Sequence, residues 1–190
     1  MITTTAHRIL VTLVLAAAMA LTRSHHFADL VHLPDASWAV FFLAGFYLAS
    51  GRAFAALLAL AVISDFAAIT FGGVSDFCIS PAYGFLVPAY GMLFLAGRWY
   101  GGRYRLTLAT LSALLVSVFS GTLACELLSS GGFFFFSGRF ADPGWSEFGH
   151  RLALYFPGAL ESVMLYLGMA MLVHVTLTMS AKRRRVREAA

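Results

Sequence analysis

Charged residues are scarce in this chain. Of its 190 residues only 12% are charged, whereas 60% are hydrophobic. A soluble domain carries about 25% charged residues, and one core of this length buries only part of so much apolar surface. The shortage of charge therefore excludes an ordinary water-soluble fold. A bilayer accepts the same surface, because a spanning helix needs about 20 mostly apolar residues.

Lysine, cysteine and several catalytic motifs are also rare or missing. The single lysine, Lys182, follows Ala181, so the chain cannot form the G-x-x-x-x-G-K-[ST] loop that holds ATP phosphates. Cys78 and Cys125 are too few for a disulfide framework and do not form a C-x-x-C pair. H-E-x-x-H and G-x-S-x-G are absent as well. These absences argue against ATP binding by this chain, disulfide exchange and standard intramembrane hydrolysis, so uphill transport would need a partner or an ion gradient.

Six apolar runs, separated by short breaks, predict an all-α integral membrane protein with six transmembrane helices in one domain, residues 1–190. The predicted helices cover approximately residues 5–22, 34–50, 53–72, 81–97, 106–128 and 152–179. Glycine pairs such as Gly72-Gly73 mark the breaks, and a longer glycine-rich loop covers Ser129–His150. The run Phe133–Phe136 in that loop is interpreted as an interfacial or loop-packing element.

The distribution of basic residues predicts the orientation, because cytoplasmic loops carry an excess of lysine and arginine. With the N-terminus inside, ten of the thirteen basic residues fall on the cytoplasmic side. They are Arg8, Arg52, Arg98, Arg103, Arg105, Lys182, Arg183, Arg184, Arg185 and Arg187. The opposite side holds only Arg23, Arg139 and Arg151. Both termini are therefore predicted to be cytoplasmic.

The first apolar run has a second interpretation. Arg8, a short apolar stretch and the triplet Ala18-Met19-Ala20 match a signal peptide with an A-x-A cleavage site. Cleavage would leave five spans in the same orientation, so the charge distribution does not decide between the two. Ala16 and Ala20 also form a small-xxx-small pair, which favours close helix–helix contact.

Three acidic residues fall within predicted spans, where charge is costly and usually functional. At about 1.5 Å of rise per residue, Asp65 lies roughly 20 Å into an apolar slab of about 30 Å. That depth requires a partner or a water-filled cavity. Glu126 and Glu161 lie nearer the outer interface, where snorkelling or a helix-packing hydrogen bond is the alternative. Together with the polar segment Gly72–Tyr83, these residues predict a pocket that opens outward.

The histidines give weaker signals. His25, His26 and His32 follow the first run, but their spacing matches no standard metal site, and a solvated loop is the simpler interpretation. His174 lies in the inner third of the last predicted helix. It is interpreted as a packing residue with a hydrogen bond.

Cys78 is the most distinctive residue of the polar segment. It precedes Pro81, a residue suited to the first position of a helix. A thiol near a helix N-terminus would favour thiolate, which is a soft ligand for a transition metal, including a metal carried by a larger ligand. The alternative is a small buried apolar side chain.

The order of several features resembles the small cobalamin transporters (BtuM-like) related to the substrate-binding S-components of energy-coupling factor transporters. The features are the six-span layout, the alanine-rich first helix, Leu33–Phe42 opening the second, Ile63-Ser64-Asp65 in the third, and Cys78 with Tyr83 before the fourth. The resemblance covers nearly the whole chain. It implies an S-component-like bundle in a bacterial inner membrane, with a binding pocket at the outer face.

The resemblance also implies roles for individual residues. Cys78 would be the axial ligand to the cobalt of cobalamin, and Asp65 and Tyr83 would flank the metal. Thiolate binding would weaken an upper cyanide ligand, so removal of cyanide from cyanocobalamin is expected as a side activity. A separate ATPase module could dock on the first helix at Ala16 and Ala20.

Other functions stay open at this point. One is the same architecture with a different small vitamin, for which Cys78 would be dispensable. Another is a membrane enzyme or a haem or quinone protein that uses Asp65, Glu126 and His174. However, His174 lies far below the other polar groups, which does not suit paired haem ligands. A helical scaffold without any bound small molecule is the last alternative.

Overall fold

The computed structural model describes residues 5–23, 33–105 and 107–188, with only the backbone at Cys78 and residues 182–188. Helices make up 85% of the structure, and the described residues form no strand. The α-helices are α1 (Thr5–Arg23), α3 (Ser37–Tyr47), α4 (Gly51–Gly72), α5 (Leu86–Gly101), α6 (Leu111–Phe136) and α7 (Trp145–Glu188). Three 3-10 turns connect them: η1 (Asp76–Cys78), η2 (Pro81–Phe85) and η3 (Leu108–Thr110).

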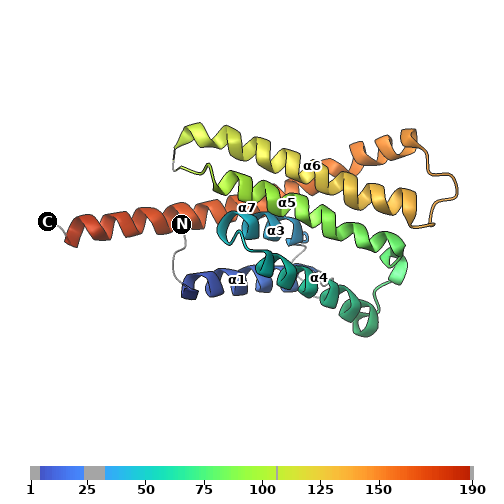
Figure 1. Ribbon diagram of the computed structural model, residues 1–190, viewed down its shortest axis with the longest axis horizontal. Helices are drawn as coiled ribbons and strands as arrows, with labels where there is room; N and C mark the ends of the chain where they lie inside the picture. The colour runs from blue at the N-terminus through green and yellow to red at the C-terminus, as the bar shows by residue number, and fades with distance from the viewer. Residues whose placement is uncertain (1–4, 24–32, 106, 189–190) are drawn as a thin grey trace.

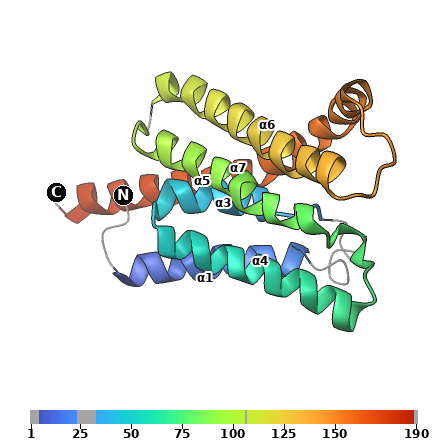
Figure 2. The ribbon, with the colours of Figure 1, turned by 45° about the vertical axis from the view of Figure 1, so that its right-hand side comes forward.

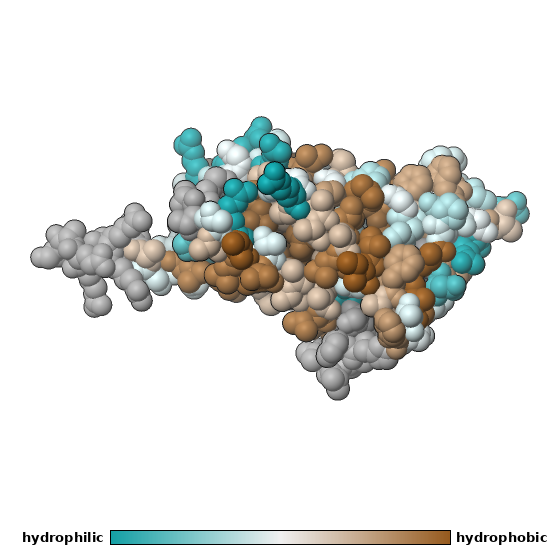
Figure 3. Space-filling view, turned by 60° about the horizontal axis from the view of Figure 1, so that its bottom comes forward, coloured by the Kyte–Doolittle hydropathy of each residue, from teal (hydrophilic) through white to brown (hydrophobic). Residues whose placement is uncertain are grey.

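Four helical segments within the described residues are long and apolar enough to cross a membrane: α1, α4, η3 with α6, and α7 as far as Ala181. Their outward faces are apolar. Leu10 and Leu13 of α1 are more than half exposed, as are Leu172 and Leu177 of α7. A broad band of hydrophobic side chains lies between hydrophilic groups at the two ends of the face in Figure 3. The chain is therefore a helical membrane protein.

The helices run roughly along one axis, with α3 between the pair α1 and α4 and the pair α5 and α6, while α7 crosses behind (Figure 1, Figure 2). Their direction alternates. Arg8 at the start of α1 donates a hydrogen bond to the carbonyl of Leu48 after α3, at 3.1 Å. Arg23 at the end of α1 contacts Ser37 at the start of α3, at 2.9 Å. The ends of α1, α4 and α6 and the start of α7 thus gather at one end of the bundle, called the site end below.

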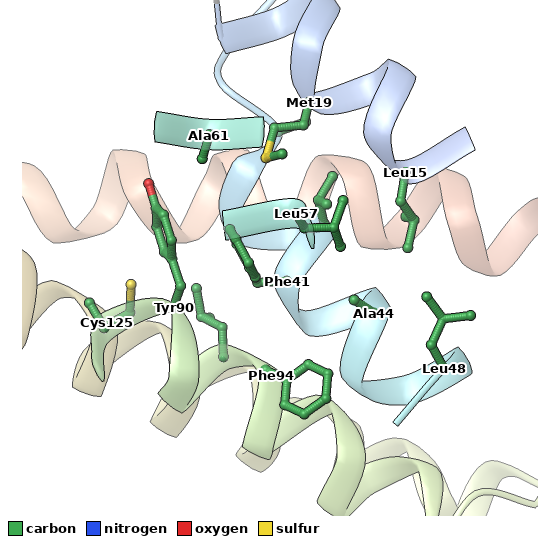
Figure 4. Close-up of a cluster of buried hydrophobic side chains, with 14 residues drawn as sticks. Leu15, Met19, Phe41, Ala44, Leu48, Leu57, Ala61, Tyr90, Phe94 and Cys125 are labelled. Atoms are coloured by element: carbon green, nitrogen blue, oxygen red, sulfur yellow. The ribbon is translucent and has the colours of Figure 1, made fainter. Parts of the chain in front are cut away.

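Helix α3 is the central element. It covers only 11 residues, against the 34–50 predicted for the second span, because Asp35 accepts hydrogen bonds from the Ser37 N–H and hydroxyl at its start and Ala49 adopts a left-handed backbone beyond its end. Phe41 and Ala44 are fully buried in the core that Figure 4 shows, with Met19 and Leu57. A helix that is hydrophobic all round belongs in a core.

Two glycines let α3 and α5 meet backbone to backbone. A methyl group added at Gly45 would lie 1.9 Å from the carbonyl oxygen of Phe94, and one added at Gly97 would lie 1.9 Å from that of Phe42. Real side chains never approach a carbonyl so closely. These glycines therefore set the closest helix contact of the fold, the contact geometry that small residues allow in membrane bundles.

The last two helices are longer than the sequence predicts. Helix α6 continues through Gly131, Gly132 and Phe133–Phe136, which the sequence assigns to a loop. The glycines do not break it because they make room for aromatic rings: a methyl at Gly132 would lie 2.4 Å from Cγ of Phe85. Helix α7 starts at Trp145 and contains Pro157, and it bends in this first part (Figure 2). The predicted loop of 129–150 shortens to 137–144.

Candidate functional site

A cavity of about 820 Å³ lies at the site end of the bundle, within the usual volume range of small-molecule sites. Its wall comes from the last turns of α1 and α4, from the η1–η2 segment, from the second half of α6 and from the start of α7. The polar residues of the wall include Arg23, Asp35, Asp65, Tyr83 and Glu126. The pocket predicted from the acidic residues and the polar segment is thus present in the structure as a cavity.

Arg23 and Asp65 form an ion pair in the wall of this cavity. Nε of Arg23 lies 2.6 Å from Oδ1 of Asp65, and Nη2 lies 2.7 Å from Oδ2, so the guanidinium binds both carboxylate oxygens. The two side chains are 10% and 23% exposed. The expectation that Asp65 needs a partner or a cavity is confirmed, since Asp65 has both.

The remaining Arg23 nitrogen holds three further groups. Nη1 donates to the Ser37 hydroxyl and to the Tyr90 hydroxyl, each at 2.9 Å, and lies 3.5 Å from Oδ2 of Asp35. Tyr90 is 3% exposed and stacks on Phe41 of the core, with ring centroids 4.4 Å apart. One arginine therefore connects α1 to α3, α4 and α5.

Tyr83 reaches the same carboxylate from the η1–η2 segment. Its hydroxyl donates to Oδ2 of Asp65 at 2.7 Å. The resemblance implies that Asp65 and Tyr83 flank one centre, and the structure brings the two side chains into direct contact. Tyr83 belongs to η2, which opens with Pro81 and precedes α5.

Cys78 closes the 3-10 turn η1, and its side chain lies outside the described part of the chain. Its neighbours Phe77 and Ile79 both line the cavity. The sequence expects a helix to start at Pro81, and the 3-10 helix η2 does start there, while the α-helix α5 begins only at Leu86. The first α-helical turn therefore lies further along the chain from Cys78 than the sequence predicts.

Glu126 and Glu161, the two other acidic residues of the predicted spans, differ in burial and in their position relative to the cavity. Glu126 is only 5% exposed and lines the cavity, with a hydrogen bond from the Ser130 hydroxyl at 2.6 Å. It is therefore not a snorkelling residue. Glu161 on α7 is exposed and is not part of the wall of the cavity.

Aromatic side chains and arginines surround the part of the cavity formed by η1, α6 and α7. Phe77 contacts Phe133, with ring centroids 5.6 Å apart, and the guanidinium of Arg139 lies 5.1 Å from the Phe77 ring. Arg151 lies 4.9 Å from the ring of Phe140. The Phe133–Phe136 run is thus the last turn of α6 and not a loop, and its first two rings, Phe133 and Phe134, line the cavity.

The remaining candidates lie away from the cavity or outside the description. His174 forms a hydrogen bond with the Tyr47 hydroxyl at 3.0 Å, which confirms its interpretation as a packing residue. Ala16 is half-buried against the core. His25, His26 and His32 fall among the residues that the structure does not describe. In the described ranges, no group of three or more His, Cys, Asp or Glu residues could hold a metal ion.

Sequence reasoning missed Arg23, Ser37 and Tyr90. It counted Arg23 only as one of the few basic residues outside the cytoplasm. One signal was present: a lone arginine directly after an apolar run, on the side that basic residues avoid, requires a reason such as an acidic partner.

Neither a scan against protein-family models nor a search of curated proteins found a match for this chain. The fold and the cavity define its class as a helical membrane protein with a mostly apolar cavity at one end of the bundle, into whose wall a few charged and hydroxyl side chains are set.

Proposed function

We propose that this protein binds cobalamin or a related corrinoid in the cavity at the site end and mediates its uptake through a bacterial inner membrane. The observation that carries the proposal is the contact of Asp65 with Tyr83 in the wall of an 820 Å³ cavity. The resemblance to the small cobalamin transporters assigns these two residues to the metal centre. The same wall includes Phe77 and Ile79, which flank Cys78 in the chain.

In this proposal the chain crosses the membrane six times, with both termini in the cytoplasm and the cavity facing outward. Helices α3 and α5 add two crossings to the four that length and composition support. Burial of α3 explains how a helix of only 11 residues can form one of the crossings, because its polar ends are covered by protein rather than lipid.

The proposed chemistry uses three residues. The Cys78 thiolate would bind the cobalt as an axial ligand, with Asp65 and Tyr83 beside the metal. With cyanocobalamin, the cobalt–sulfur bond would form as the cobalt–carbon bond breaks, and cyanide would leave with the bonding electron pair. The cobalt would remain Co(III), and the departing cyanide would take up a proton, for which the Tyr83–Asp65 pair would be the relay.

The energy source is a separate part of the proposal. The chain has no loop for ATP, so an ATPase module or an ion gradient would drive uphill uptake. The docking surface proposed for such a module is α1, around Ala16 and Ala20. Support for it comes from the resemblance alone, since Ala16 is half-buried against the core.

The test is an absorption spectrum of the protein purified from cells grown with cobalamin. Wild type and Cys125→Ala should both carry a corrinoid with the same shifted spectrum, because Cys125 is a fully buried free thiol. Cys78→Ala should lose the corrinoid or show the spectrum of the free vitamin. Cys78→Ala should also abolish cyanide release from cyanocobalamin.

Two results would contradict parts of the proposal. If Cys78→Ala carries the corrinoid with an unchanged spectrum, the transporter stands and the role of Cys78 is wrong. If no variant, wild type included, carries or binds a corrinoid, the ligand is a different one and the resemblance misleads.

A further inference from the structure

Glu126 is a buried carboxylate on a wall of the cavity that the proposed metal chemistry does not use. It lies in the second half of α6, is 5% exposed, and lines the cavity. Its hydrogen bond from Ser130, one turn further on the same helix, occupies Oε1. Among the described residues, no lysine, arginine or histidine nitrogen lies within ion-pair distance of it.

A carboxylate can accept about four hydrogen bonds, and its burial is unfavourable unless donors are available to it. Asp65 in the same cavity shows the usual solution, since it accepts from both Arg23 and Tyr83. Among the described residues, Glu126 has one hydrogen-bond donor, from its own helix. Because Glu126 also lines the cavity, its free acceptor positions are available to a molecule that occupies the cavity.

The neighbouring hydroxyls on α6 strengthen this point. Ser129 and Ser130 also line the cavity, and both have already donated their protons: Ser129 to the carbonyl of Cys125 at 2.9 Å, and Ser130 to Glu126. Their oxygens can only accept further bonds. The polar groups that α6 contributes to the cavity are therefore all acceptors, and they match a ligand surface that carries N–H donors.

We infer that Glu126, with Ser129 and Ser130, is a second recognition site in the cavity for N–H donors of the ligand, of the carboxamide class. The inference rests on the proposed function, because a corrin ring carries primary carboxamides around its edge while its cobalt lies at the centre. The residues proposed for the cobalt (Cys78, Asp65 and Tyr83) would then contact the centre of the ring. The α6 site would bind the carboxamides at its edge.

The experiment compares two corrinoids that differ in these donors. Cobinamide carries the peripheral carboxamides, whereas heptamethyl cobyrinate carries methyl esters that accept hydrogen bonds but donate none. Affinities are measured by absorption titration on wild type, Glu126→Ala and Glu126→Gln, with Glu161→Ala as the matched control. Glu161 is the exposed glutamate of α7 outside the cavity wall.

Wild type and Glu161→Ala should bind cobinamide ten- to a hundredfold more tightly than the ester, the usual effect of one hydrogen bond to a charged group. Glu126→Ala should bind cobinamide only about as well as the ester, with the cobalt spectrum of the bound form unchanged. Glu126→Gln keeps the shape and one acceptor oxygen, so it should fall between the two, and it carries the comparison if Glu126→Ala does not fold.

The outcomes separate the two proposals. Corrinoid binding with an amide preference that survives both Glu126 substitutions overturns the role of Glu126 and leaves the proposed function intact. A preference lost equally in Glu161→Ala also overturns it, since the effect is then not specific to the cavity. Absence of corrinoid binding in wild type overturns both.

Discussion

Arg23 binds side chains from three other helices, so its substitution should lower the stability of the whole bundle. Arg23→Met keeps the length of the side chain and removes the cation from Asp65, which is 23% exposed. Removing one partner of a buried ion pair costs about 3–5 kcal/mol, and the partial exposure of Asp65 places the expected loss near 3 kcal/mol. Arg23→Lys should recover only part of it, because lysine cannot bind both carboxylate oxygens in parallel.

The measurement is thermal unfolding in one detergent, followed by circular dichroism. Arg151→Met is the matched control, because the Arg151–Glu147 pair is 38% and 55% exposed and spans one helical turn. Such pairs contribute about 0.5 kcal/mol or less, and the contact of Arg151 with the Phe140 ring adds about 0.5–1 kcal/mol, so the loss should stay well below that of Arg23→Met. Equal melting temperatures for Arg23→Met and Arg151→Met would show that the Arg23–Asp65 pair does not stabilise the bundle.

Two buried hydroxyls on α6 lead to opposite predictions. Thr122 is fully buried, and its hydroxyl has no hydrogen-bond partner in the described part of the chain. Ser117 is 2% exposed and donates to the carbonyl of Ala96 at 2.7 Å. Thr122→Val removes an unsatisfied polar group at nearly constant volume and should raise the stability by about 1 kcal/mol, while Ser117→Ala should lower it by about 1 kcal/mol.

The same melting assay, run on both variants side by side, checks this pair. Thr122→Val should melt above wild type and Ser117→Ala below it. If Thr122→Val melts at or below Ser117→Ala, the Thr122 hydroxyl has a partner in the membrane, such as a bound water.

At the scale of whole elements, the α3–α5 crossing depends on the absence of a side chain at two positions. Gly45→Ala or Gly97→Ala would place a methyl 1.9 Å from a backbone carbonyl of the facing helix, and the helices must separate to accommodate it. Overpacking of this kind costs about 1–3 kcal/mol, and the rigid backbone partner points to the upper part of that range.

Gly91 provides the control on α5, since an added methyl there meets nothing within 4 Å. Gly91→Ala should be neutral or stabilise by up to about 1 kcal/mol, because alanine is the better helix former. Thermal unfolding in detergent compares the stability of Gly45→Ala and Gly97→Ala with that of Gly91→Ala, and gel filtration checks that each variant is folded and not aggregated. Wild-type melting of Gly97→Ala would mean that α3 and α5 lie further apart than the structure places them.

Sequence patterns located the apolar elements but not their roles. The break at Gly72-Gly73 was predictable, because Gly73 has a left-handed φ of 65° that ends α4. The central position of α3 was not predictable, since an apolar run has the same sequence pattern whether lipid or protein surrounds it. From the sequence, Gly132 suggests the end of a helix, but in the structure it lies inside α6 and makes room for the ring of Phe85. Such a glycine can be interpreted only once its neighbour is known.

The candidate site was predictable to a similar degree. Asp65 and Glu126 attract attention because of their charge and depth, and Tyr83 because of the resemblance; all three line one cavity. The partner of Asp65 was not predictable, because Arg23 lies 42 residues away in the chain, and no sequence periodicity relates positions on different helices. Whether a carboxylate is paired with a cation, like Asp65, or has none among the described residues, like Glu126, is decided by packing alone.

At the scale of the whole molecule, the alternating direction of the helices and the distribution of basic residues lead to one prediction about the membrane. Arg52, Arg98 and Arg103 lie at or near the starts and ends of α4 and α5, at the end of the bundle opposite the cavity. Basic residues favour the cytoplasmic side, so the cavity should face outward. Because Leu48 after α3 meets Arg8 at the start of α1, α3 returns the chain to the basic end even though it is too short to span alone.

Single cysteines introduced at two exposed positions test this arrangement in intact cells, in a background with Cys78→Ser and Cys125→Ala. Asp142→Cys lies between α6 and α7 and should react with a membrane-impermeant maleimide added outside, whereas Thr107→Cys lies between α5 and α6 and should react only after the membrane is permeabilised. Both positions flank α6, so equal labelling would mean that α6 does not cross. Reversed labelling would place the cavity in the cytoplasm, where it could release a ligand but could not capture one from outside.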